Sequence, residues 1–200
     1  AQGRIYVTGG LDEDDMPMDT IYAFDPAREQ GNTWQAESVS LSQARFCHGT
    51  VAVNGKVYIF GGLETWEDGE VFTATGEIFD PQTGTISEMA AMPAALGRFG
   101  TATDGRYIYV VGGTGNDFWY SPTKAVLRYD TQTDTWSSLA DRQLSHARLS
   151  CGAVFVSGKG LYTINGGILD DGSFSSTSQG LLLDEAFLAD ADGDQIPDQD

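Results

Sequence analysis

The sequence predicts an all-β fold that repeats one four-stranded antiparallel unit along the chain. Gly-Gly occurs four times, and successive pairs lie about fifty residues apart, which is typical of an array of one supersecondary unit. Each pair ends a short apolar segment that carries a tyrosine. Of the 200 residues, 40% are hydrophobic and 11% aromatic, so the chain can form a packed core. The paired glycines are Gly9, Gly10, Gly61, Gly62, Gly112, Gly113, Gly166 and Gly167.

The first strand of a unit is expected directly after an arginine. These strands are 46–53 after Arg45, 99–103 after Arg98 and 149–156 after Arg148. Asn54-Gly55 and Asp104-Gly105 follow the first two of them and predict tight hairpins, because a type I′ turn needs positive φ at both central positions. Residues 157–160 supply a looser turn of the same kind.

The second strand ends in Gly-Gly, and a long loop leads to the third. The third strands end in an aromatic or aliphatic residue followed by aspartate, at 22–25, 78–80, 127–130 and 181–184. A polar turn then leads to a short fourth strand, which is marked by Trp34 or Trp136 and by Ile86 in the unit between them.

This pattern resembles the kelch repeat over roughly residues 4–184. The resemblance implies a β-propeller, in which each unit is a four-stranded blade around a central axis. The strands amount to about 3.5 blades, an incomplete ring, so we expect further blades from the same or another chain to be needed for closure. We expect the glycines to allow close backbone approach, the tryptophans and tyrosines to fill the space between blades, and the arginines to bind carbonyls of neighbouring blades.

The last unit departs from the pattern. Tyr162 lies four residues before Gly166, whereas the other tyrosines lie three residues before their first glycine. The second strand of this unit is therefore expected to be offset or bulged.

The charge excludes two classes of partner. The chain carries 29 acidic and 11 basic residues, for a formal net charge of −18. Such a field repels nucleic acid and anionic lipid. No apolar run approaches the length of a membrane span.

The loops after the double glycines are expected on one face. In each antiparallel unit, the start of the first strand and the end of the second strand lie on the same side. Long loops on one side of a rigid scaffold are where binding residues concentrate. Four aromatic residues in these loops are candidates for contact with a protein or a glycan, and they are Trp66, Phe118, Trp119 and Tyr120. Alternatively, these aromatics fold back and anchor their own loops.

Catalysis is not favoured. His48 and His146, the two histidines, fall at different distances from their arginines, so no converging set of metal or catalytic ligands is predicted.

The C-terminal segment predicts a calcium site. Aspartates recur there at Asp190, Asp192, Asp194, Asp198 and Asp200. Alternating carboxylates can wrap one Ca²⁺ ion, and the segment resembles a thrombospondin type 3 calcium repeat or the start of an EF-hand loop. Gln195 stands where both patterns have glycine. The alternative is an acidic linker, and in either case we expect a boundary between propeller blades at 1–185 and this segment at 186–200.

These observations lead to one functional hypothesis and one alternative. The chain is expected to be a secreted or cell-surface module for adhesion or assembly, with a protein or glycan on its long-loop face and Ca²⁺ in its tail. The alternative is a fragment of a carbohydrate-active or oxidising propeller enzyme whose catalytic residues lie elsewhere.

Overall fold

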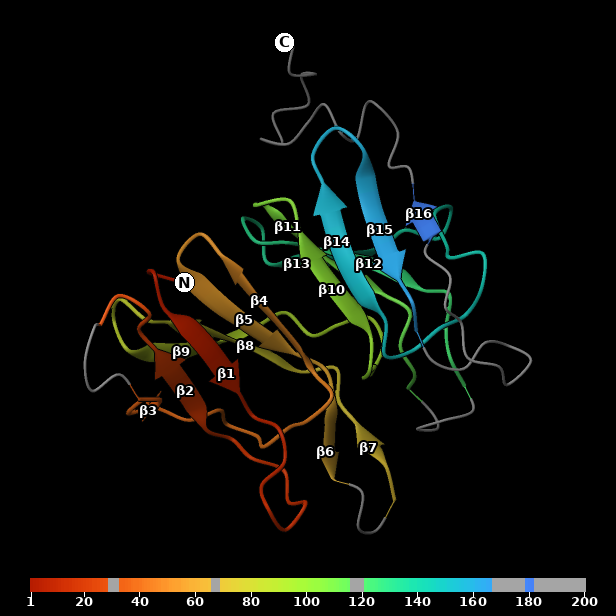
Figure 1. Cartoon of the computed structure of the whole chain (residues 1–200). Helices are drawn as coiled ribbons and strands as arrows, with labels where there is room; N and C mark the ends of the chain where they lie inside the picture. The colour runs from red at the N-terminus through yellow and green to blue at the C-terminus, as the bar shows by residue number, and fades with distance from the viewer. Residues whose placement is uncertain (29–32, 66–68, 116–120, 167–178, 182–200) are drawn as a thin grey trace. The chain divides into compact units, whose positions relative to one another are not determined.

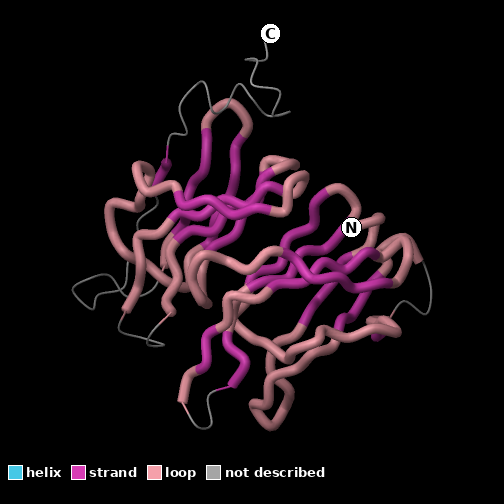
Figure 2. Tube along the Cα trace, turned by 180° about the vertical axis from the view of Figure 1, so that it is seen from behind, coloured by secondary structure: helices cyan, strands magenta, loops and turns pink. Residues whose placement is uncertain are grey.

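The computed structural model describes residues 1–28, 33–65, 69–115, 121–166 and 179–181. Strands make up all of the regular secondary structure in these ranges, as Figure 2 shows. The chain divides into two compact units, Ala1–Gly97 and Arg98–Asp200. The predicted all-β architecture of four-stranded antiparallel sheets is confirmed.

The first unit contains two sheets and a small hairpin (Figure 1). Sheet 1 has the order β1 (Ile5–Thr8), β2 (Ile21–Phe24), β3 (Gln35–Ala36). Sheet 2 has the order β4 (Gly49–Val53), β5 (Lys56–Phe60), β8 (Gly76–Asp80), β9 (Thr85–Met89). The hairpin, β6 (Leu63–Thr65) and β7 (Val71–Phe72), lies within the loop between β5 and β8.

The second unit repeats this plan. Sheet 3 has the order β10 (Gly100–Thr103), β11 (Tyr107–Val111), β12 (Val126–Asp130), β13 (Thr135–Ser138). Sheet 4 consists of β14 (Gly152–Val156), β15 (Gly160–Ile164) and β16 (Gln179–Leu181). All strand pairs in both units are antiparallel.

The two predicted Gly-containing turns differ from each other. Asn54 and Gly55 have φ values of 49° and 80°, so the type I′ prediction is confirmed there. Asp104 is not at positive φ, and the same prediction is wrong for Asp104-Gly105. The Asp104 carboxylate instead accepts hydrogen bonds from the amides of Arg106 and Tyr107, at 2.9 and 2.6 Å, so its side chain stabilises a different turn.

The double glycines join each sheet to the chain that enters the next one. The Gly10 amide donates to the Arg45 carbonyl at 2.9 Å, and the Gly113 amide donates to the Arg148 carbonyl at 2.8 Å. Gly9 and Gly112 lie so close to the same two carbonyls that a Cβ atom would collide with them. Both glycines of a pair also have positive φ, which side chains disfavour.

In the fourth repeat, Asn165 and Gly166 occupy the double-glycine position. Their φ values are 55° and 132°, and the Arg148 guanidinium donates to the Asn165 carbonyl at 2.9 Å. In sheet 2, Arg45 donates in the same way to the Gly61 carbonyl at 3.0 Å. The predicted offset of the strand is therefore wrong: β15 keeps its register, asparagine tolerates positive φ, and Gly167 lies outside the described residues.

Arg98 does not correspond to the other two arginines. The Gly62 amide donates to the carbonyl of Leu96, which therefore takes the place of Arg45 and Arg148. Arg98 lies two residues later with φ of 57°, at the position of Cys47 in sheet 2 and Ser150 in sheet 4. Matching the arginines by sequence was thus misleading in the third repeat.

Aromatic rings fill the core in two ways. Tyr6 meets Phe79 edge to face at 5.7 Å between sheets 1 and 2, and Tyr109 stacks on Phe155 at 5.7 Å between sheets 3 and 4. The tryptophans pack on their own sheets instead, and Trp136 lies 5.1 Å from Tyr129. Trp34 lies 5.2 Å from Phe24 and is 46% exposed.

Sheet 1 has an uncovered apolar face. Ile5 and Val7 of β1 are 52% and 48% exposed. The corresponding residues of β5, Val57 and Ile59, are 1% and 0% exposed because they pack in the core cluster with Ile21 of sheet 1.

Arg45 and Glu77 form a buried ion pair in sheet 2. Their side chains are 0% and 5% exposed, and Arg45 Nη2 lies 3.7 Å from Glu77 Oε2. The guanidinium also donates to the Thr75 carbonyl at 3.0 Å, whereas Glu77 accepts from the Ser42 amide at 2.9 Å. These side-chain bonds of Arg45 lie within its own sheet rather than with a neighbouring one. In the third repeat both positions hold leucine, Leu96 and Leu127.

This pairing predicts a strong coupling. Arg45→Leu alone buries the Glu77 carboxylate without its cation and should lower the free energy of unfolding by about 3–5 kcal/mol, as should Glu77→Leu. The double variant Arg45→Leu/Glu77→Leu has the two leucines of the third repeat. Its free energy of unfolding should fall by much less than the sum of the two single losses. Urea denaturation of the four proteins measures this, and additive losses would contradict the pairing.

His48 is held neutral between sheets 1 and 2. Its Nε2 lies 2.9 Å from the Thr8 hydroxyl, which lies 2.8 Å from that of Thr50. Burial and then the Arg45 charge lower the pKa of His48 from 6.5 to about 4, whereas the contact with Thr8 acts in the opposite direction. The unfolded chain therefore binds a proton here at a pH where the folded chain does not.

Stability should consequently fall with pH in one defined window. The contribution of neutral His48 is fully present above pH 6.5 and is lost as the pH falls towards 4, by up to roughly 3 kcal/mol. His48→Gln should reduce this loss when thermal unfolding is followed from pH 7.5 to 4.5. His146→Gln, at an exposed histidine, is the matched control and should behave as the parent protein. Identical pH profiles for all three proteins would rule out the neutral His48.

Candidate functional site

The long loops of the first unit leave sheets 1 and 2 on the same side (Figure 1). We call the surface formed by residues 9–20, 61–65 and 69–75 the loop face. In the first loop, Leu11 pairs with Pro17 in an isolated bridge. The Asp12 carboxylate accepts from the amides of Asp14 and Met16, at 2.9 and 2.8 Å. The loop is thus fixed by backbone groups and one aspartate, while Glu13, Asp14 and Asp15 are exposed.

The second long loop contains a β-hairpin, β6 and β7. Leu63 of β6 is fully buried and exchanges two hydrogen bonds with Phe46, at 3.0 and 2.9 Å. The Gln43 amide donates to the Glu64 carboxylate at 2.8 Å. The apolar pair Val71-Phe72, which lies opposite Thr65 and Leu63, was the available signal for this hairpin.

The loop face carries negative charge and no positive charge. Its sequence ranges contain no lysine or arginine. The carboxylates in its described residues belong to Asp12, Glu13, Asp14, Asp15, Asp19, Glu64 and Glu70. Several carboxylates on loops with fixed bases present a surface that attracts cations.

Several predicted site residues cannot be placed. Trp66, Phe118, Trp119 and Tyr120 lie outside the described residues, as do Asp190, Asp192, Asp194, Asp198 and Asp200. Their roles in partner and calcium binding stay predictions, as does the domain boundary after residue 185. The loop that contains 118–120 is closed at its base by a bridge between Thr114 and Pro122.

A polar pocket of about 450 Å³ lies at the base of the loop face, beside β8 and β9. Sequence reasoning missed it, because it depends on Gly76, Glu77 and Glu88, none of which belongs to a repeated motif. Register pairing places Glu77 opposite Glu88.

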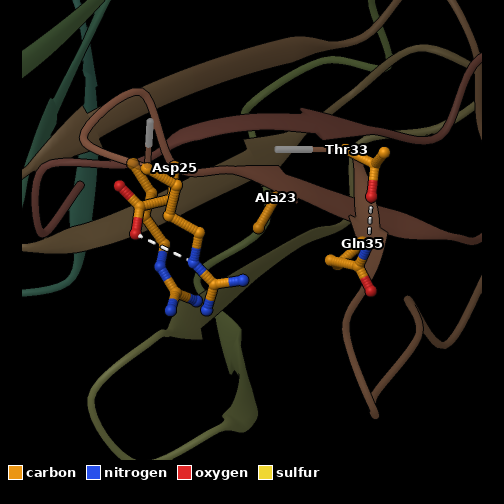
Figure 3. Close-up of a pocket in the computed structure, with 6 residues that line it drawn as sticks. Ala23, Asp25, Thr33 and Gln35 are labelled. Carbon is orange, nitrogen blue, oxygen red and sulfur yellow. Dashed lines mark hydrogen bonds and ion pairs between the residues drawn. The ribbon is translucent and has the colours of Figure 1, made fainter. Parts of the chain in front are cut away.

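A smaller cavity of about 40 Å³ on sheet 1 has a structural role (Figure 3). Arg28 pairs with Asp25 at 3.7 Å, and the Gln35 amide donates to Thr33 at 2.6 Å. Arg4, which also lines the cavity, pairs with Glu37 at 3.8 Å. Both cations are therefore matched by carboxylates of the sheet itself.

His48 lies in the first unit and His146 in the second. Across the described ranges, no three His, Cys, Asp or Glu side chains are grouped as metal ligands would be. Within the same ranges, no helix is long and apolar enough to cross a membrane.

Comparison with known proteins gives consistent matches. Residues 1–167 match the model of the KLHDC2/KLHL20/DRC7 Kelch-repeats domain. The chain is 29% identical over 150 residues to Kelch-like protein 15 of Danio rerio, covering 67% of this chain and 24% of that protein. It is 36% identical over 103 residues to Kelch-like protein 24 of Rattus norvegicus, covering 52% and 15%. A Kelch domain-containing protein of Pyrococcus furiosus is 33% identical over 97 residues, covering 48% and 28%. The chain thus spans less than a third of these relatives.

These matches contradict the function predicted from the sequence. Kelch-like proteins are typically intracellular protein-binding adaptors, whereas we expected an extracellular adhesion module with bound calcium. The prediction was wrong because it took acidic charge and the tail aspartates as evidence of an extracellular setting. Acidic charge favours solubility in any compartment. Calcium coordination by the tail stays a separate prediction, and so do the location of the whole protein, a glycan partner and ring closure by further blades.

The strand order, the repeated junction and the comparisons with known proteins all indicate the same family. The sheets are built on one strand order, the double-glycine junction recurs from sheet to sheet, and the family model covers most of the chain. The chain belongs to the kelch-repeat family, and its sheets are blades of a partial kelch β-propeller.

Proposed function

We propose that this chain is a protein-interaction module whose loop face binds a basic segment of a partner protein. Kelch domains bind protein partners, which supports the general class. The observation that carries the proposal is the charge of the loop face, where carboxylates from two loops have no cation in their sequence ranges.

The geometry of the loops suits this role. Glu13, Asp14 and Asp15 follow Asp12 in a loop whose backbone is fixed by hydrogen bonds, so binding costs little ordering of the chain. Negative charge on an exposed rim speeds encounter with a positively charged partner and makes binding depend on salt. Apolar and hydrogen-bonding contacts are then needed for affinity, since exposed ion pairs contribute only about 0.2–1 kcal/mol each.

Removing two of these charges should weaken binding. Glu13→Gln/Asp14→Asn takes away two exposed carboxylates and leaves Asp12, which holds the loop. On an array of peptides graded in lysine and arginine content, this variant should bind basic peptides roughly two- to tenfold more weakly and with less salt dependence.

The matched control is Asp25→Asn/Asp80→Asn, which removes the same charge at the ends of β2 and β8 opposite the loop face, where asparagine can still accept the turn hydrogen bonds of Ala27 and Gln82. It should keep the parent affinity. Equal binding by all three proteins, or equal losses in both variants, would refute the proposed face. Capture of neutral glycans in place of basic peptides would replace the proposed partner with a carbohydrate.

A further inference from the structure

The polar pocket beside β8 and β9 is a feature of sheet 2. Its volume is about 450 Å³, and its walls come from the chain entering sheet 2 and from the ends of β8 and β9. The residues that line it include Ser42, Thr75, Gly76, Glu77, Glu88, Met89 and Ala91.

The glycine at position 76 lets the Met89 side chain pack closely against β8 at this pocket. A Cβ atom at Gly76 would lie 2.7 Å from Met89 Sδ and 2.9 Å from Phe60 Cβ, so Met89 occupies the space above the glycine. The corresponding residue of sheet 3 is Val126, which is 1% exposed and packs in an apolar cluster. In sheet 2, Met89 therefore takes the space that a valine side chain fills in sheet 3.

Two carboxylates line the pocket, and only one of them gives it net charge. Glu77 and Glu88 are opposite one another on neighbouring strands, so both project from the same face. Glu77 is buried and is neutralised by Arg45. Glu88 is exposed, and no lysine or arginine in the described ranges lies within ion-pair distance of it. Sheet 3 has Leu127 and Ser138 at these positions, so the charge is also confined to sheet 2.

We propose that this pocket receives one lysine or arginine side chain of the basic partner segment. The inference rests on the proposed function, which it sharpens to a specificity pocket at the base of the loop face. Met89 and Ala91 give an apolar wall for the aliphatic stem, while Glu88 accepts the cationic head.

Single-residue probes test the pocket without involving the loops. Nα-acetyl-lysine amide should shift the backbone resonances of Gly76 and Glu88 in a titration of the labelled chain followed by NMR. Nα-acetyl-norleucine amide has a similar apolar stem without the ammonium group and should not. Glu88→Gln should weaken lysine binding by roughly two- to fivefold. Ala91→Leu, at an exposed residue, should block it sterically.

Two controls separate this inference from the proposed function. Glu37→Gln should bind the lysine probe as the parent does, and so should the loop variant Glu13→Gln/Asp14→Asn. If lysine and norleucine derivatives shift the same resonances equally, or if Glu88→Gln has no effect, the pocket is not a cation site. The peptide-array measurements would still test the loop-face proposal independently.

Discussion

The structure depends on one backbone contact, in which the amide of a second glycine meets the carbonyl of the residue that enters the next sheet. In the described residues this hydrogen bond, with an N–O distance of 2.8 to 2.9 Å, joins Gly10 to Arg45, Gly62 to Leu96 and Gly113 to Arg148. The contact requires a backbone at positive φ. At Gly9 and Gly112 the approach is so close that it leaves no room for a Cβ atom. Side chains can vary around it, as Leu96 in place of arginine shows, because the contact itself uses only main-chain atoms.

This contact also positions the candidate site. The chain that leaves a double glycine starts each long loop, and the chain held by it lies directly before the first strand of the next sheet. Gln43 and Leu63 therefore lie near the same junction, where Gln43 binds Glu64 and Leu63 pairs with Phe46. The polar pocket begins there with Ser42. A rigid junction thus supports both the acidic loops and the pocket at their base.

Much of the fold could be predicted because its signals recur. Four evenly spaced glycine pairs gave the repeat, and Asn54-Gly55 gave its hairpin. The errors arose where one repeat replaces a residue by a physical equivalent. Asn165 takes a glycine's place because it tolerates positive φ, and Leu96 takes an arginine's place while Arg98 nearby mimics it in sequence. The pocket could not be predicted, because it depends on which residues of β8 and β9 pair across the sheet. Gly76 and Glu88 are separated in sequence and are brought together only by that register. The functional error had a different origin, since charge alone does not reveal a compartment.

The junction is tested most directly by comparing two glycines of the first unit. Gly9 and Gly84 both have positive φ, 55° and 68°, but only Gly9 faces the Arg45 carbonyl, whereas nothing lies within 4 Å of a Cβ atom at Gly84. Gly84→Ala should therefore lose only the cost of the left-handed backbone, about 1–2 kcal/mol. Gly9→Ala should lose clearly more in the free energy of unfolding measured by urea denaturation, because the Cβ atom must also displace the chain that enters sheet 2. Equal losses in the two variants would contradict the claim that contact with the chain entering sheet 2 requires glycine at position 9.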